Sequence, residues 1–184
     1  GKILTWNKKP INTVYHATNG GVMASVDEAW SINQVPYLQT RLDGPKQWTR
    51  SVDLPLSNEK YLKSFLFSKS EAFGSDHPLF RWERTIDSFQ ISKDLNKAQK
   101  VDSSFYPKKI EVEMRGRSGR VTSLKIYGKD GSEMFLKIDD IRRVLRELPS
   151  TLFVVKEIKE GKWLFSGGGF GHGAGMSQSG AIEL

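Results

Sequence analysis

Apolar and polar residues alternate through much of the second half of the chain. Ile110, Val112 and Met114 occupy every second position of one run, and turns at Gly119 and Lys129–Gly131 follow it. Because successive side chains of a strand point to opposite faces, a period of two is typical of half-buried strands joined in hairpins. The predicted strands are 108–115, 120–128, 132–138, 151–158 and 162–170.

Helical spacing is found in three shorter segments. Ser57 is a candidate N-cap for a helix through about Ala72, and Ser92 for a short second helix. Asp139 is a candidate N-cap for a third helix, which ends before Pro149. The residues expected to face inward are Tyr61, Phe65 and Leu66 in the first helix, Leu95 and Ala98 in the second, and Ile141, Val144, Leu145 and Leu148 in the third.

The first half of the chain is less periodic. Residues 2–18 are interpreted as two strands around a turn at Asn7–Pro10, and Thr18–Gly21 as a further turn, since Asn-Gly suits positive φ. Residues 31–56 contain scattered prolines and predict mostly loop, whereas 76–91 predict a loop leading into a strand. The whole pattern predicts an α+β fold, with antiparallel β-hairpins and a few short helices.

Composition is that of a globular chain long enough to bury a core without disulfides. The 184 residues are 38% hydrophobic and 27% charged, with no cysteine, which excludes disulfides and thiolate metal sites. No apolar run approaches the ~20 residues of a membrane span. This length predicts one domain, 1–184.

A net charge of +7 favours an anionic partner. The basic residues are scattered, however, apart from two clusters. Arg115, Arg117 and Arg120 surround a glycine turn, and we interpret them as part of a hairpin turn. Arg142, Arg143 and Arg146 lie on a predicted helix, where a solvated face explains them. Charge alone therefore does not identify the partner.

The glycine-rich stretch Gly167–Ala181 (GGGFGHGAGMSQSGA) is the main candidate for chemistry. Every odd position from Gly167 to Gly175 is glycine, so a strand here would have one bare face and carry Phe170, His172 and Met176 on the other. A bare face lets a sugar ring or another backbone approach closely. Ser177 or Ser179 is a candidate cap for a following helix. A purely structural glycine strand is the alternative.

Other chemistries fit this stretch poorly. Gly169, Gly171 and Ala174 match G-x-G-x-x-A, but the dinucleotide fold needs that turn early in a βαβ unit, and no Walker lysine follows. His16, His77 and His172 share no metal-ligand spacing, so we expect no metal and no cofactor. A serine triad would lack its nucleophile elbow. Aromatic and basic residues do not interleave as in nucleic-acid readers, which argues against a nucleic-acid partner.

Two separated motifs carry a resemblance that covers nearly the whole chain. Tyr15–Gly21 (YHATNGG) and Gly169–Ala181 (GFGHGAGMSQSGA) resemble the stage II sporulation protein D family, which includes the amidase-enhancer LytB proteins. Asn19 stands where serine is common in that family. The intervening family features occur in the usual order: Pro36–Leu38, Trp82, Arg117–Val121 and Ile141–Leu145.

The resemblance implies a lytic transglycosylase acting on peptide-free glycan strands of peptidoglycan, which leaves 1,6-anhydro ends. The family's catalytic glutamate lies on a helix upstream of the first motif, so we expect that acid, and any membrane segment, to precede residue 1. The catalytic residue is therefore unknown here, and we interpret Glu28 as a loop or helix-start carboxylate. The alternative is a non-catalytic cell-wall module that enhances a partner amidase. Both functions imply an extracytoplasmic location in the cell envelope.

The two motifs together define the predicted substrate-binding site. We expect His16 and His172 to line one cleft, in which stripped glycan strands keep a lactyl carboxylate that suits a basic protein. The hydrogen-bonding neighbours predicted for the two histidines are Thr18, Asn19, Ser177 and Gln178. A histidine satisfied at a strand end is the alternative for His16, and turn chemistry is the alternative for Thr18 and Asn19.

Overall fold

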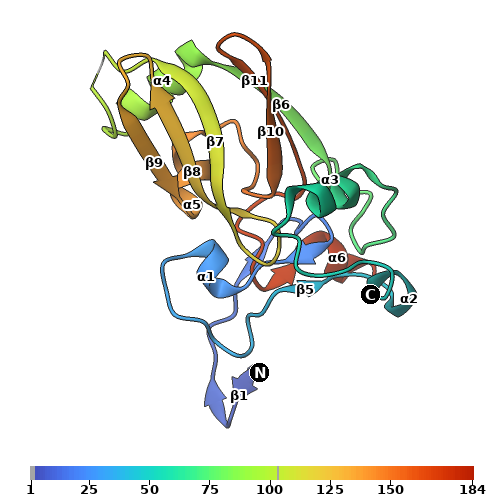
Figure 1. The fold of residues 1–184 in the computed structure, drawn as a ribbon. Helices are drawn as coiled ribbons and strands as arrows, with labels where there is room; N and C mark the ends of the chain where they lie inside the picture. The colour runs from blue at the N-terminus through green and yellow to red at the C-terminus, as the bar shows by residue number, and fades with distance from the viewer. Residues whose placement is uncertain (1–2, 103) are drawn as a thin grey trace.

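A computed structural model of the chain describes residues 3–102 and 104–184 and has the predicted α+β architecture (Figure 1). Two three-stranded antiparallel sheets form its upper part, in the orders β7-β8-β9 and β10-β11-β6. The five strands predicted between residues 108 and 170 correspond to β7–β11, and the strand expected within residues 76–91 corresponds to β6. Their bounds are β6 Trp82–Asp87, β7 Pro107–Arg115, β8 Val121–Gly128, β9 Glu133–Lys137, β10 Phe153–Lys159 and β11 Lys162–Gly167.

The main core involves both sheets and the helices α4 (Ser88–Lys97) and α5 (Asp139–Val144). Ile110 of β7 is buried there, whereas Met114 of the same strand is exposed because β7 has register shifts near Val112 and Met114. All four residues predicted to face inward from the third helix are buried. Asp139 is the first residue of α5 rather than its cap, which is Ile138.

A second cluster packs around α3 (Glu59–Phe67), where the sequence prediction needs correction. The side chain of Asn58, not Ser57, caps this helix, by accepting from the backbone N–H of Lys60. The helix ends at Phe67 instead of near Ala72. Phe65 and Leu66 are buried as predicted, but Tyr61 is 61% exposed. Leu62 takes the inward position because it lies three and four residues from Phe65 and Leu66.

The helix predicted to start at Ser92 begins earlier. Asp87 caps α4 by accepting from the backbone N–H of Gln90, so Ser92 lies inside the helix. Leu95 is fully buried, as predicted, but Ala98 is exposed at the C-terminal end. An aspartate at the end of a strand was the better capping signal.

Short elements from both ends of the chain form the lower part of the molecule (Figure 1). The hairpin β1-β2 projects away from the rest, with its turn at Asn7 and Lys8. Most of residues 31–56 is loop, as predicted. The bounds are β1 Thr5–Trp6, β2 Lys9–Pro10, β3 Tyr15–His16, β4 Val22–Met23, α1 Val26–Ala29, β5 Arg41–Leu42, α2 Lys46–Thr49, β12 Met176–Ser177 and α6 Gln178–Ile182.

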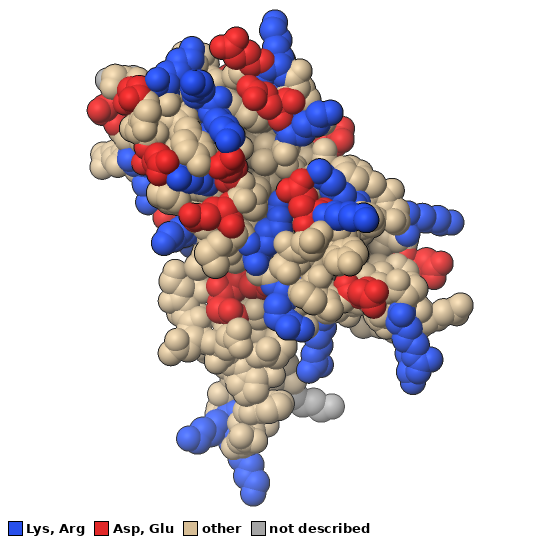
Figure 2. Space-filling view, in the orientation of Figure 1, with Lys and Arg blue, Asp and Glu red and all other residues tan. Residues whose placement is uncertain are grey.

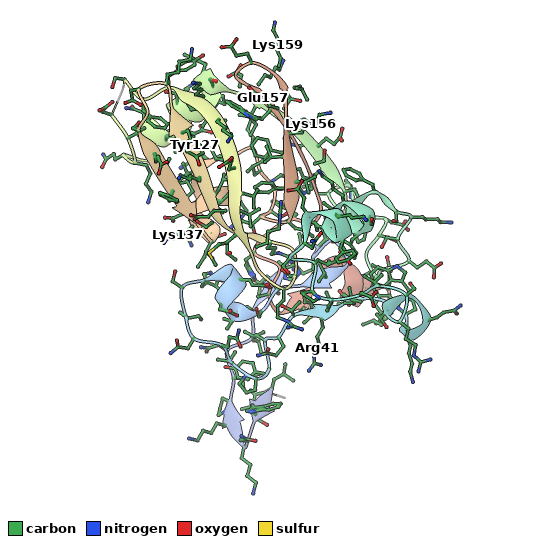
Figure 3. All side chains as sticks on the ribbon, in the orientation of Figure 1. Arg41, Tyr127, Lys137, Lys156, Glu157 and Lys159 are labelled. Carbon is green, nitrogen blue, oxygen red and sulfur yellow. The ribbon has the colours of Figure 1, made fainter. Side chains whose placement is uncertain are left out.

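Charged side chains of both signs are intermixed over the visible surface of the sheets, and much of the lower surface is uncharged (Figure 2). Figure 3 shows the side chains that project from these faces, including Lys156 and Lys159 of β10 at the upper end. Arg120 is different, because it is fully buried. The Arg115–Arg120 cluster lies at the turn of the β7-β8 hairpin, as interpreted, and Gly119 turns the chain there with φ +85°.

Candidate functional site

The two histidine motifs meet through a short parallel pairing of β3 with β12. In this register Met176 lies beside Tyr15 and Ser177 beside His16. The rings of His16 and His172 stand edge to face with their centroids 5.5 Å apart. Trp30, which follows α1, lies 4.5 Å from the His172 ring. The structure thus places both predicted histidines in one cluster, with a tryptophan that the sequence analysis did not select.

His16 is the inner member of the pair, with 5% of its surface exposed. Its Nδ1 lies 3.0 Å from the carbonyl oxygen of Ala174, so Nδ1 carries the proton and donates it. Nε2 is buried and has no hydrogen-bond partner among the described residues. Burial, and to a smaller extent the positive charge of Arg120, lower the pKa of His16 to about 3. The hydrogen bond to the Ala174 carbonyl raises this pKa but does not offset the two larger effects. His16 is therefore neutral at physiological pH.

His172 is the outer member and is half-buried. Its Nδ1 accepts from the backbone N–H of Ala174 at 3.2 Å, which leaves the proton of the neutral ring on Nε2. Burial lowers the pKa of His172, while a backbone hydrogen bond at Tyr15 and the charge of Asp139 oppose this. Ala174 thus orients both imidazoles, accepting from one and donating to the other.

Most of the polar neighbours predicted for this site have partners within the fold. Thr18 and Asn19 accept from the backbone N–H groups of Gly20 and Gly21, which is the turn chemistry that was their alternative explanation. Asn19 also donates to Asp43 at 2.5 Å. Ser177 caps α6 by accepting from the N–H of Gly180, so one of the two predicted caps is used. Thr18, Asn19 and Ser177 are buried, and Gln178 is exposed. Their binding of glycan stays a prediction.

The prediction that the glycine stretch forms a strand with a bare face is wrong. β11 ends at Gly167, and the following residues make only isolated bridges, Thr18 with Phe170 and Ala24 with Ala174. Four of the five odd-numbered glycines of the stretch, all except Gly167, lie in the left-handed region, which strands do not use. Their φ values are +83° at Gly169, +107° at Gly171, +80° at Gly173 and +78° at Gly175. The stretch is a run of turns packed against residues 14–24.

The chain's own groups fill the space left by the missing side chains. A Cβ added at Gly173 would overlap the guanidinium of Arg120, and one added at Gly175 would overlap the carbonyl of Val14. The glycines therefore allow close packing of the protein on itself. A long alternation of glycine suggested a period of two, but the positive φ values produce that spacing without a strand.

Two buried charged side chains, Arg120 and Glu28, lie in the core near the glycine stretch without forming an ion pair with each other. Arg120 donates to the carbonyl oxygens of Val22 and Asn19, each at 3.0 Å. Burial lowers the pKa of Arg120 to about 10, against the charge of Glu28, so the guanidinium stays protonated. Glu28 lies in α1, as the helix-start interpretation predicts, and is buried. No pattern in the sequence indicates that Arg120 packs beneath the histidine site.

Exposed aromatic and thioether side chains surround the histidine cluster. Tyr15 is 63% exposed beside Met176, and Phe170 is 43% exposed two residues before His172. Sugar rings bind to such apolar surfaces through their C–H faces, with nearby polar groups fixing their orientation. The cluster therefore combines exposed apolar side chains with two imidazoles whose pKa values are lowered by burial.

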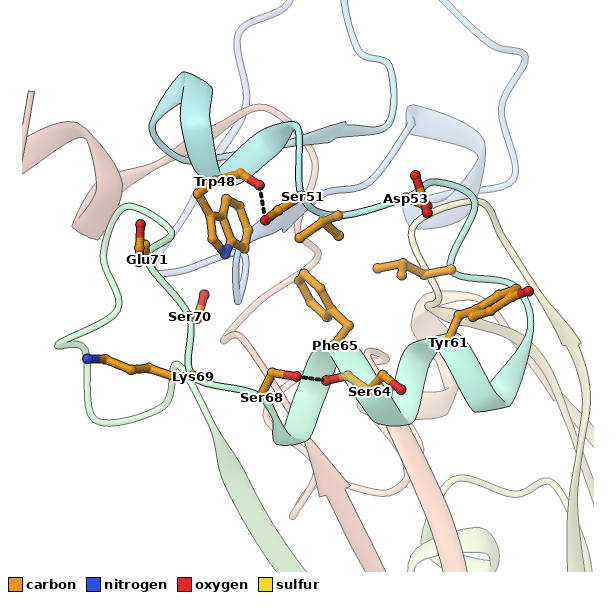
Figure 4. Close-up of a pocket in the computed structure, with 12 residues that line it drawn as sticks. Trp48, Ser51, Asp53, Tyr61, Ser64, Phe65, Ser68, Lys69, Ser70 and Glu71 are labelled. Carbon is orange, nitrogen blue, oxygen red and sulfur yellow. Dashed lines mark hydrogen bonds between the residues drawn. The ribbon is translucent and has the colours of Figure 1, made fainter.

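A separate pocket of about 390 Å³ lies between α3 and the segment after α2 (Figure 4). Trp48, Phe65 and Tyr61 line it, and no residue of the predicted site does. Its hydroxyl groups are partly engaged within the fold, since Ser51 donates to Trp48 and Ser68 to Ser64 (Figure 4). The predicted site is therefore separate from this pocket.

Within the part of the chain that the structure describes, no helix is long and apolar enough to cross a membrane. No three histidine, aspartate or glutamate side chains within it form a group suited to a metal ion.

Comparison with known proteins gives one family and one curated relative. Residues 24–175 match a family described as "Domain of unknown function (DUF8618)". A protein named "Amidase enhancer" from Bacillus subtilis (strain 168) is 28% identical over 201 residues, which cover 98% of this chain and 28% of that protein. The chain thus spans just over a quarter of the length of this relative.

Proposed function

The chain belongs to the DUF8618 family, and from this membership together with its likeness to an amidase enhancer we propose that it is a cell-wall module. In this proposal it acts outside the cytoplasm, in the cell envelope, where it binds peptidoglycan glycan strands and increases the activity of a partner amidase. The observation that carries the proposal is a likeness that extends over 98% of the chain and so includes both histidine motifs.

The geometry of the histidine cluster supports binding of an uncharged sugar face. His16 is neutral and buried, and half-buried His172 is the more exposed imidazole of the pair. Trp30, Tyr15 and Phe170 supply rings near His172. A polar imidazole among aromatic rings matches a sugar, which presents hydroxyls at its edge and C–H groups on its faces.

The first test measures enhancement directly. Purified cell walls are incubated with a cell-wall amidase, with and without this protein, and the release of new amino termini is followed. We expect faster release with the protein, and wall binding in a pull-down. His172→Ala should lose about tenfold in wall affinity together with the enhancement, because it removes a hydrogen bond and a ring contact. Its melting temperature should change little, because His172 is half-buried.

The control for this test is Tyr61→Ala, which removes an exposed aromatic side chain far from the histidine cluster in sequence. It should bind walls as the wild type does. An unchanged amidase rate with the wild-type protein would contradict enhancement. Wall binding that survives in His172→Ala would remove the histidine cluster from the binding site.

Glycan cleavage is the second candidate, since the resemblance of the two motifs implies a lytic transglycosylase. That reaction needs a carboxylic acid to protonate the glycosidic oxygen. Glu28 is poorly placed for it: Oε1 accepts from the N–H of Ser118, and Oε2 from the N–H of Ser25 and the hydroxyl of Thr40. A carboxylate held by three donors and buried is a structural group.

The second test therefore looks for cleavage products. Peptide-free glycan strands are incubated with these 184 residues alone, and the products are analysed by mass spectrometry. We expect binding without 1,6-anhydro products, because Glu28 is engaged in the fold. Anhydro products from this chain would show that it holds the acid, and Glu28→Gln would then show whether Glu28 is that acid.

A further inference from the structure

A groove of about 590 Å³ lies beside the glycine stretch, on the side of α5 and β6. Four arginines line it, Arg84 from β6 and three from the segment 142–146, and one carboxylate, Glu147, also lines it. Its walls include apolar residues, among them the exposed ring of Phe170. The complete lining is Leu79, Arg84, Arg142, Arg143, Arg146, Glu147, Leu148, Pro149 and Phe170.

The guanidinium groups of the groove retain much of their donor capacity. Arg142 and Arg143 share one carboxylate, Asp139, which the two bind through Arg142 Nε and Nη2 and through Arg143 Nε. Arg84 donates to the carbonyl of Glu83 and forms no ion pair with any other side chain that the structure describes. Each arginine carries five N–H donors, so one shared carboxylate leaves most of them open to a ligand.

The groove lies close to the histidine cluster. Phe170 lines the groove, and two residues later His172 contacts Trp30. The N–H of Gly171 donates to the carbonyl of Pro149 at 3.0 Å, which ties the glycine stretch to the groove wall. The charges of Asp139 and Arg142 both influence the pKa of His172, whose largest change is the lowering caused by burial. A polymer bound at the histidines would extend past Phe170 to reach the arginines.

We propose that this groove is a binding subsite for the carboxylate groups of an anionic glycan, with Phe170 packing against a sugar face. The inference rests on the proposed function and adds a second site to it, a groove that holds the free carboxylates of the strand apart from the histidine cluster. Planar guanidinium groups match carboxylates bidentately, and separate arginines suit a polymer whose charges recur at intervals.

Nucleic acid fits the groove less well. Single-stranded nucleic acid is bound by a series of aromatic side chains on which successive bases stack, together with a basic track along the backbone. The groove offers one ring, Phe170. A sugar polymer needs only one such platform between its charged groups, so the observations favour the glycan.

The test compares glycans with and without their carboxylates. The double variant Arg84→Gln/Arg146→Gln removes two positive charges from the groove and leaves the Asp139 contacts of Arg142 and Arg143 intact. Lys156→Gln/Lys159→Gln removes the same charge from exposed positions of β10 that do not line the groove. Both variants and the wild type are titrated with peptide-free glycan strands, and with the same strands after conversion of the carboxylates to amides.

We expect the arginine variant to bind unmodified strands about tenfold more weakly than wild type, because two charge-assisted contacts are lost. The lysine variant should bind as the wild type does. Amidated strands should bind the wild type and the arginine variant equally weakly. Equal affinity of the wild type and the arginine variant for unmodified strands would overturn the inference.

The remaining outcomes separate this inference from the proposed function. Absence of any glycan binding by the wild type would contradict the proposed function itself. A loss confined to the titration with poly(glycerol phosphate), or with an oligonucleotide, would assign the groove to phosphate and overturn its assignment to carboxylates. Unchanged melting of the arginine variant shows that its fold is intact.

Discussion

Gly173→Ala is expected to lower the free energy of unfolding by about 3–5 kcal/mol, a large part of the total for a domain of this size. Two effects add. The backbone at Gly173 has φ +80°, which costs a residue with a Cβ about 1–2 kcal/mol. The new methyl group would also overlap the guanidinium of Arg120. Moving Arg120 breaks its bonds to the carbonyls of Val22 and Asn19, which then stay buried without a partner.

The matched control is Gly131→Ala. Gly131 has nearly the same backbone conformation, φ +84°, but nothing lies within 4 Å of an added Cβ. This variant should lose only the conformational part, about 1–2 kcal/mol. Chemical denaturation of the wild type and both variants measures the difference. If Gly173→Ala unfolds at the same denaturant concentration as Gly131→Ala, Arg120 moves without cost and the packing argument is wrong.

This comparison also decides between the two explanations of the glycine stretch. If the glycines served to admit a ligand, substitution would damage binding more than stability. The structure instead places Arg120 against Gly173 and Val14 against Gly175, so stability should be lost first. The motif then contributes to function indirectly, because the same tight turns hold His172 and Phe170 at the surface of the molecule.

The sheets were predictable from sequence because each strand has its own local signal. Alternation and glycine turns specify β7, β8 and β9 without reference to the rest of the chain. The spacing of Ile141, Val144 and Leu145 likewise specifies α5, and all three are buried. Errors at helix ends had local causes too: Asn58 and Asp87 compete with nearby serines as caps, and sequence does not decide between them.

The site was less predictable because it depends on packing between the two ends of the chain. The two motifs that carry the family resemblance, Tyr15–Gly21 and Gly169–Ala181, predicted that His16 and His172 are close, and their ring centroids are 5.5 Å apart. Nothing in the sequence indicates that Arg120 is buried beneath them, since an arginine next to a glycine turn is usually exposed. Trp30 was missed for a related reason: it approaches His172 only through tertiary structure.

The buried groups beneath the motif impose a second large effect, a loss of stability in acid. His16 has a pKa of about 3 in the folded protein, because burial and the Arg120 charge disfavour its protonated form. In the unfolded chain a histidine has a pKa of about 6.5. Above that pH both states are neutral and the stability is complete. As pH falls below 6.5 the unfolded state binds a proton that the native state does not, so stability falls until the native His16 also protonates near pH 3.

The expected slope from this one residue is about 1.4 kcal/mol per pH unit, or about 3 kcal/mol between pH 7 and pH 4. His16→Asn removes the titrating group and keeps an N–H donor for the Ala174 carbonyl, so its unfolding free energy should depend less on pH by that amount. His172→Asn is the matched comparison and should remove a smaller part of the slope, because His172 is less buried and burial is the largest cause of both pKa shifts.

Urea denaturation of the wild type, His16→Asn and His172→Asn at pH 7, 6, 5 and 4 gives the three slopes. Carboxylates titrate in the same range but are common to all three, so they cancel in the differences. Equal slopes for the wild type and His16→Asn would mean that His16 accepts a proton in the native state, and its buried Nε2 would then need an acceptor that the fold does not supply.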